Sequence, residues 1–207
     1  MRIDWLTFNP LEFIAAFILS ISLWIIERQR KPKFLIKRGK PSLLFEDNYK
    51  TLNLKIINVK RKGITSFLNH VATQVRVYLY FLDYPSKVEF NKIIARWNSS
   101  REPVTPDYKN VDVGLALTNP REVLVSGEEG EISVVIRKKD KTSCFPFNNE
   151  SYLYWKQDYS KPEWEIKDGK FIIRVEVQSA EVQDVIKEFL ILNKGTIEQF
   201  KISELTQ

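Results

Sequence analysis

Residues 73–84 have the sequence TQVRVYLYFLDY, in which apolar side chains alternate with polar or tyrosine side chains. An extended chain would place four apolar side chains on one face, those of Val75, Val77, Leu79 and Phe81. A period of two residues is typical of a β-strand with one buried face, and β-branched and aromatic residues suit that surface. The stretch therefore predicts a strand of an antiparallel sheet that covers a core.

Shorter alternating stretches lie on both sides of this strand, with turn-forming residues between them. They predict strands over 42–46, 49–59, 122–126, 131–137, 171–178 and 185–192, and an edge strand or a short helix over 196–205. The turn from Gly127 to Gly130 predicts a hairpin. Seven or eight strands without long helices between them predict a mainly β fold, an antiparallel immunoglobulin-like sandwich.

The segment Ser86–Trp97 fits two structures. Ser86 and Glu89 form a capping box, and the apolar residues after them have helical spacing. Residues 92–97 also alternate as a strand would, and we favour a strand there. Residues 140–162 form a long irregular stretch, which is uncommon unless it is functional or packs on itself.

The N-terminal region contains the apolar stretch Leu11–Ile26, LEFIAAFILSISLWII, whose one charged residue is Glu12. A membrane-spanning helix needs about 20 apolar residues, and this stretch is slightly shorter. Asn9 and Pro10 form a natural helix start. We predict one transmembrane helix over about residues 10–27, with Trp5 and Trp24 near the two membrane interfaces. The alternative is a helix buried in the core.

Basic residues follow the apolar stretch at once, whereas a cleaved signal peptide has them before it. Those that we place at the membrane interface are Arg28, Arg30, Lys31 and Lys33. Cationic flanks stay in the cytoplasm, so a single-pass protein of the cell membrane with a cytoplasmic C-terminal domain is predicted. The cations either bind anionic lipid headgroups or only fix this orientation. The predicted organisation is an anchor over 1–27, a basic linker over 28–41 and a sandwich domain over 42–207.

The charge distribution argues against nucleic-acid binding. The chain has a net charge of +6, of which residues 1–40 carry +5 and the rest +1. The predicted domain is therefore nearly neutral and lacks the basic surface that nucleic acid requires. The short basic cluster Arg137–Lys139 lies at a predicted strand end and is interpreted as solvated loop charge.

Few residues of the sequence suit catalysis. His70 is the one histidine and Cys144 the one cysteine, so a two-histidine metal site, a disulfide and a thiolate cluster are excluded within the chain. The glycines are scattered and form no phosphate-binding loop. We therefore predict no enzyme activity, no cofactor and no metal site.

Several stretches resemble the CARDB-like and related immunoglobulin-like domains of prokaryotic proteins. The similar stretches are residues 52–59 with the basic turn after them, 72–79, 124–129, 167–171 and 175–177. The resemblance covers about residues 49–193, with long insertions at 99–119 and 140–162. It implies an adhesion or protein-interaction module, and it provides no catalytic residues.

The long irregular stretch is rich in tyrosine and tryptophan, which dominate the energetics of protein interfaces. We predict a partner surface formed by Tyr152, Tyr154, Trp155, Tyr159 and Trp164. Alternatively, these side chains pack over an open end of the sandwich. The predicted function is a membrane-anchored interaction or scaffold module with an unidentified protein partner. The alternatives are an extracytoplasmic surface or pilin-like filament subunit and an accessory subunit of a membrane complex.

Overall fold

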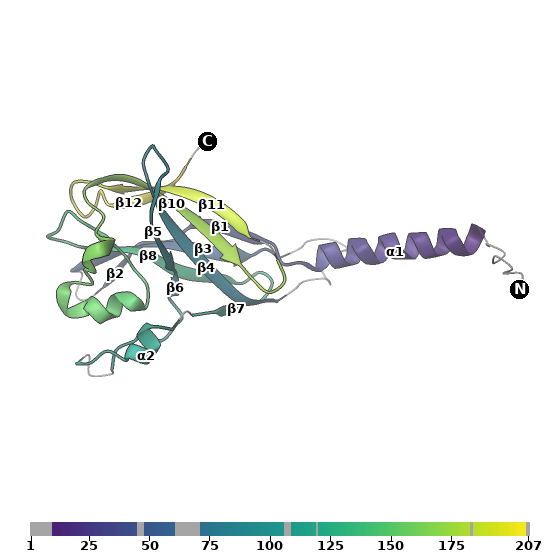
Figure 1. The fold of residues 1–207 in the computed structure, drawn as a ribbon, viewed down its shortest axis with the longest axis horizontal. Coiled ribbons are helices and arrows are strands. Elements are labelled where there is room, and N and C mark those ends of the chain that lie inside the picture. The colour runs from purple at the N-terminus through teal and green to yellow at the C-terminus, as the bar shows by residue number, and fades with distance from the viewer. Residues whose placement is uncertain are drawn as a thin grey trace, which may run out of the picture.

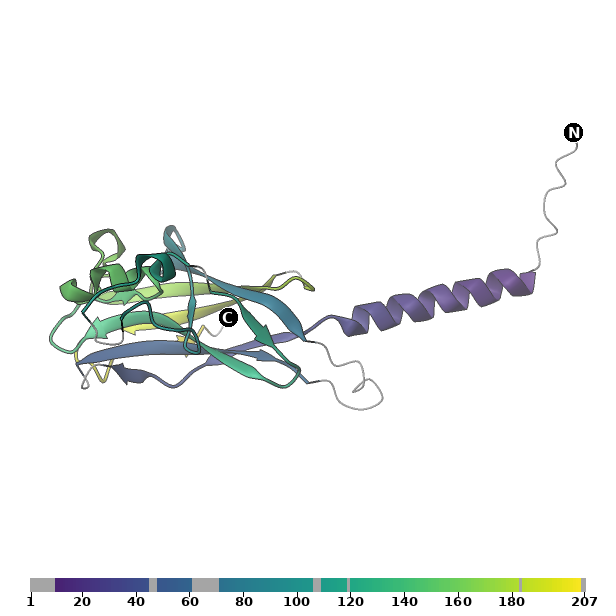
Figure 2. The same cartoon turned by 90° about the horizontal axis from the view of Figure 1, so that it is seen from below.

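A computed structural model of the protein describes residues 10–44, 48–60, 71–105, 109–118, 120–182 and 184–205. Helix α1 (Pro10–Arg30) projects from one end of a β-rich body (Figure 1). A view turned by 90° shows two layers of strands in that body (Figure 2). The prediction of a mainly β protein with two antiparallel sheets is confirmed.

The first sheet has the order β1-β3-β8-β6, with β2 also beside β3 and β9 beside β8. Its strands are β1 (Phe34–Arg38), β2 (Ser42–Leu44), β3 (Tyr49–Asn58), β6 (Arg96–Trp97), β8 (Glu129–Lys138) and β9 (Phe145–Pro146). The second sheet has the order β12-β11-β10-β4-β5, with β7 beside β4. Its strands are β4 (Ala72–Asp83), β5 (Glu89–Ile94), β7 (Glu122–Leu124), β10 (Gly169–Gln178), β11 (Val185–Asn193) and β12 (Lys201–Glu204). All strand pairs are antiparallel.

Strand β4 confirms the prediction made from residues 73–84. The four alternating apolar side chains of that stretch, Val75, Val77, Leu79 and Phe81, are fully buried. Residues of the facing sheet, such as Leu54 and Ile56 of β3, meet them in one core cluster. The core therefore lies between the two sheets, as the alternation of apolar residues requires.

The segment Ser86–Trp97 contains no helix. Ser86 lies in a turn, and the strand that we favoured over residues 92–97 is present but is divided between the two sheets. Strand β5 pairs with β4, and β6 pairs with β8 of the other sheet. Ala95 lies between them, is fully buried, and donates its N–H to the Val77 carbonyl at 2.8 Å. The small side chain lets the chain cross the core there.

The predicted hairpin around Gly127 is wrong, because β7 pairs with β4 and β8 with β3. Asn58 at the end of β3 holds the turn between β7 and β8. Its carbonyl accepts the Gly127 N–H at 2.7 Å, and its side-chain amide donates to the Leu124 carbonyl at 2.8 Å. This connection therefore passes from one sheet to the other.

The sandwich begins earlier than position 42. Strand β1 lies within the segment predicted as a basic linker, and it pairs with β3 from Phe34 to Arg38. Phe34 and Ile36 are buried in the core, whereas Lys37 and Arg38 are exposed. These two basic residues thus belong to an edge strand of the first sheet.

Helix α1 begins at Pro10 and ends at Arg30, three residues beyond the predicted end. Side chains from Leu11 to Glu27 are exposed, so the alternative of a helix buried in the core is wrong. The sequence predicted a transmembrane helix over residues 10–27. Among the residues that the structure describes, no helix combines the length and the apolar character that crossing a membrane requires.

Candidate functional site

The segment Cys144–Ile166 forms a compact lobe, called the aromatic lobe below. It contains the 3-10 helices η2 (Glu150–Gln157) and η3 (Pro162–Trp164). Its two ends are joined by paired backbone hydrogen bonds between Cys144 and Ile166, at 3.0 and 2.9 Å. The lobe lies at the end of the sandwich opposite α1 in both views (Figures 1 and 2). Such a closed loop can fold as a unit on a rigid scaffold.

A second core holds the aromatic lobe against the sandwich. Phe147, Tyr152 and Tyr159 are buried, and their ring centroids lie 5.5 Å apart in each pair. Tyr159 also contacts Tyr49 of β3 edge-on, at 5.6 Å. Aromatic pairs with these geometries are stabilising beyond the area that they bury.

Asp158 joins the aromatic lobe to both central strands of the first sheet. Its carboxylate accepts a hydrogen bond from the Tyr49 hydroxyl at 2.6 Å and from the Lys138 ammonium at 3.0 Å. The hydrogen bond from Tyr49, together with Lys138, lowers the pKa of Asp158 although partial burial opposes the shift. Burial, followed by the bond to the Asp158 carboxylate, raises the pKa of Tyr49. The carboxylate is therefore ionised at neutral pH and the tyrosine is protonated.

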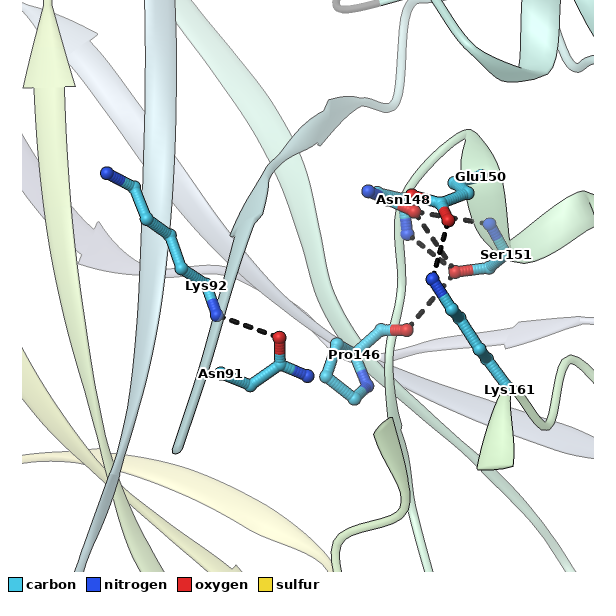
Figure 3. Close-up of polar contacts among 7 residues, drawn as sticks. All are labelled: Asn91, Lys92, Pro146, Asn148, Glu150, Ser151 and Lys161. Carbon is cyan, nitrogen blue, oxygen red and sulfur yellow. Dashed lines mark hydrogen bonds and ion pairs between the residues drawn. The ribbon is translucent and has the colours of Figure 1, made fainter. Parts of the chain in front are cut away.

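The start of η2 is held by a local hydrogen-bond network (Figure 3). The Ser151 hydroxyl accepts the Asn148 N–H at 3.0 Å and donates to the Pro146 carbonyl at 3.2 Å. Glu150 forms an ion pair of 2.7 Å with Lys161, near the start of η3. The aromatic lobe is thus tied together at its base and between its two helices.

The five aromatic residues predicted as a partner surface divide into two groups. Tyr152 and Tyr159 are buried, so self-packing accounts for both of them. Tyr154, Trp155 and Trp164 are half-buried and reach the surface. The ammonium groups of Lys161 and Lys156 lie 4.2 and 5.6 Å from the centroids of the Trp164 and Trp155 rings. A partner surface formed by these three residues stays a prediction.

Cys144 has a structural role at the base of the lobe. Its side chain is fully buried in the main core, and this burial raises the pKa of the thiol far above its usual range. A thiol that stays protonated is a poor nucleophile. His70 lies outside the described residues. Within those residues, His, Cys, Asp and Glu side chains form no group of three or more that could hold a metal ion.

Five of the six residues predicted at a membrane interface belong to the C-terminal part of α1 or follow it directly. Trp24 is exposed on the helix, and Lys31 and Lys33 are exposed directly after it. The backbone of Arg28 and Arg30 continues α1, and their side chains lie outside the described part. Trp5 precedes the described residues. Headgroup binding by these residues stays a prediction.

The interpretation of Arg137–Lys139 as solvated loop charge is wrong for Arg137, which is 2% exposed. Its guanidinium donates to the carbonyls of Lys141 and Gly195 and to the Asn193 side-chain oxygen, at 2.8, 2.5 and 3.1 Å. All three acceptors are neutral. Asn193 and Gly195 are distant in the sequence, and Lys141 is four residues away. No local pattern around residue 137 indicates this burial.

Comparisons with protein-family models, with curated proteins and with solved structures find no match to the chain.

Proposed function

We propose that the protein is a membrane-anchored β-sandwich that acts as an interaction or scaffold module and has no catalysis of its own. The observation that carries this proposal is the exposure of α1. Large apolar side chains from Leu11 to Ile26 are between 38% and 74% exposed. Monomeric soluble proteins rarely expose contiguous apolar surface of this extent, which is typical of membrane or protein contact.

The two serines of α1 suit a lipid environment. The hydroxyls of Ser20 and Ser22 donate to the carbonyls of Ala16 and Ile18, each at 2.8 Å. Polar groups in lipid must be satisfied within the protein, and bonds to the carbonyl four residues earlier satisfy these hydroxyls. The apolar helix therefore presents few free polar groups to its surroundings.

The dimensions of α1 set how it would sit in a bilayer. At ~1.5 Å per residue, Leu11–Ile26 extends about 24 Å, against a hydrocarbon core of ~30 Å. A short stretch is accommodated by local thinning or by flanking side chains that reach the headgroups. Lys31 and Lys33 are exposed directly after α1, where their side chains can reach the headgroups. Their positive charge favours a cytoplasmic sandwich domain.

The contact surface in this proposal is the exposed part of the aromatic lobe. It lies at the far end of the sandwich from α1, where it can meet a partner away from the bilayer (Figures 1 and 2). Trp155 and Trp164 are half-buried, so their rings are held in place yet open on one side. Held aromatic side chains lose little conformational entropy on binding, which favours them as interface anchors. The resemblance to immunoglobulin-like interaction domains supports the same role.

A second candidate function uses the same exposed helix. An apolar α1 can pack against the α1 helices of other copies, as in a pilin-like filament, or against a larger membrane complex. Protease treatment of intact and lysed cells separates the proposed cytoplasmic module from an extracytoplasmic surface subunit. The proposal predicts protection of the sandwich in intact cells, and cleavage in intact cells would favour the surface subunit.

Partner recovery tests the contact surface. We expect Trp155→Ala with Trp164→Ala to weaken recovery of a cross-linked partner from cells, while the melting temperature shows that the sandwich stays folded. Tyr78→Ala with Phe90→Ala is the matched control, because these aromatic side chains lie on the surface of the second sheet. Equal recovery with both double variants would refute the assigned contact surface.

A further inference from the structure

A pocket of about 260 Å³ opens where the edge of the first sheet is interrupted. Strands β1 and β2 both pair with β3, and the ladder is interrupted at residues 39–41 between them, where the Gly39 N–H still donates to the Asn53 carbonyl at 2.9 Å. The register of β3 against β8 shifts at the same point, between Leu52 and Asn53. Bulges of this kind often lie beside functional sites, because they redirect side chains.

Asn53 lines this pocket and is fully buried. Its side-chain amide nitrogen donates to the Lys40 carbonyl at 2.9 Å and to the Ser42 hydroxyl at 2.8 Å. Its side-chain oxygen is buried and accepts no hydrogen bond from the described residues. A buried acceptor without a donor is costly, so a ligand that supplies an N–H there is favoured.

The rim of the pocket is cationic. Its lining includes the basic residues Arg38, Lys40, Lys50 and Lys201, and one acidic residue, Glu198. Lys50 is half-buried and donates to the backbone carbonyls of Ile197 and Glu198, at 2.8 and 3.5 Å. In the described part of the chain it therefore bonds to neutral acceptors.

The buried Arg137 adds positive charge behind the pocket. Its guanidinium carbon lies 5.6 Å from the ring centroid of Phe200, which lines the pocket. Burial lowers the pKa of Lys50, Glu198 opposes this shift, and Arg137 adds to it by a smaller amount than Glu198 opposes it. The two cations, Lys50 and Arg137, are partly or fully buried and bond to neutral groups. Their positive charge would attract an anion to the pocket.

The inner wall of the pocket is apolar, formed by the buried side chains of Leu52, Phe200 and Ile202. We propose that the pocket binds a short acidic peptide segment of a partner protein. Its carboxylates would lie on the cationic rim, an apolar side chain on the inner wall, and a backbone N–H against the Asn53 oxygen. A peptide offers all three groups together, whereas an inorganic anion offers only the charge.

The position of the pocket disfavours a lipid headgroup as the ligand. The five residues of β1 lead away from α1, and at ~3.3 Å per residue they extend about 17 Å. The pocket lies past the end of that strand. The site is separate from α1 and from the aromatic lobe, so its test is independent of the proposed function.

Fluorescence anisotropy with the full chain in zwitterionic micelles provides the test. The probe is a fluorescein-labelled peptide of alternating glutamate and leucine, and its glutamine counterpart is the control. Binding of the glutamate peptide should weaken as salt is raised, because salt screens exposed charges. We expect Lys40→Glu with Lys201→Glu to lower the affinity by about tenfold or more, since two attractive charges become repulsive.

The control variant is Lys167→Glu with Lys170→Glu, which makes the same change of net charge at exposed sites that do not line the pocket. It should retain the affinity of the unchanged protein. Equal binding of the glutamine peptide, or an equal loss in the control variant, would overturn the proposal. Complete displacement of the peptide by an equal concentration of inorganic phosphate, or binding of phosphatidylglycerol vesicles without peptide binding, would overturn it too.

Discussion

Tyr49→Phe removes one hydroxyl and with it the 2.6 Å bond to the Asp158 carboxylate. A hydrogen bond to a charged group contributes about 1.5–3 kcal/mol. The Asp158 side chain is 35% exposed, so solvent screens part of this energy. We expect the free energy of unfolding to fall by about 1–2 kcal/mol, which in a domain of this size lowers the melting temperature by about 2–4 °C per kcal/mol.

A double-mutant cycle with Asp158→Asn measures the part of the bond that depends on the carboxylate charge, because the asparagine oxygen can still accept from the Tyr49 hydroxyl. Asp158 has a φ of 59°, in the left-handed region, which asparagine also tolerates, so this substitution removes charge without backbone strain. Denaturant unfolding at pH 7 measures the four proteins. Tyr154→Phe is the matched control, because it removes a tyrosine hydroxyl from the aromatic lobe, to which Asp158 belongs. The reasoning is refuted if Tyr49→Phe and Asp158→Asn are additive.

The same bond predicts a pH dependence. The folded-state pKa of Asp158 is lowered, so its contribution to stability is fully present above the unfolded value of about 3.9. It is lost as the pH falls through the lowered folded-state pKa. Stability of the wild-type protein should therefore fall more steeply in acid than that of Asp158→Asn. Hydrogen exchange should place the added opening in residues 150–164.

Three further predictions concern the sandwich itself. Phe81→Ala should lower the free energy of unfolding by about 3–5 kcal/mol, because it leaves a cavity between the sheets, and chemical denaturation measures this. Gly130→Ala should lower the free energy of unfolding by about 1–3 kcal/mol, since the new Cβ would lie 2.6 Å from the fully buried Trp97 ring. Gly114→Ala is the control and should have little effect, because its new Cβ would lie 3.4 Å from the nearest atom. The Cys144 thiol should react with a thiol reagent only at the rate of unfolding, and fast labelling of the folded protein would contradict its structural role.

The strands with long apolar alternation could be predicted from the sequence. Strands β3, β4, β10 and β11 each have nine or more residues, and one face of each is buried. Strand β1 was missed because three of its five residues are exposed and two of those are basic. A run of positive charge beside an apolar helix has the same composition whether it is a membrane linker or the outer face of an edge strand.

The features that the sequence does not indicate depend on contacts between distant residues. The passage of the chain from one sheet to the other at Ala95 depends on a bond to Val77 in β4. The burial of Arg137 depends on acceptors between 4 and 58 residues away. The aromatic composition of residues 152–164 indicated an unusual segment, but which rings face inward is decided by Tyr49 and Phe147. Composition therefore indicates the segment, and packing decides which of its aromatic rings are buried and which reach the surface.

Extraction of cell membranes with alkaline carbonate tests the central claim, which is that α1 anchors the sandwich in a bilayer. The wild-type protein should stay in the membrane pellet after extraction. Ile18→Lys places a charge near the middle of the apolar stretch, at a cost of about 2.5–3.5 kcal/mol for a helix in lipid, and should move much of the protein to the supernatant. Ser20→Ala is the control and should behave like wild type. Release of the wild-type protein, or retention of Ile18→Lys to the same extent, would contradict the anchor.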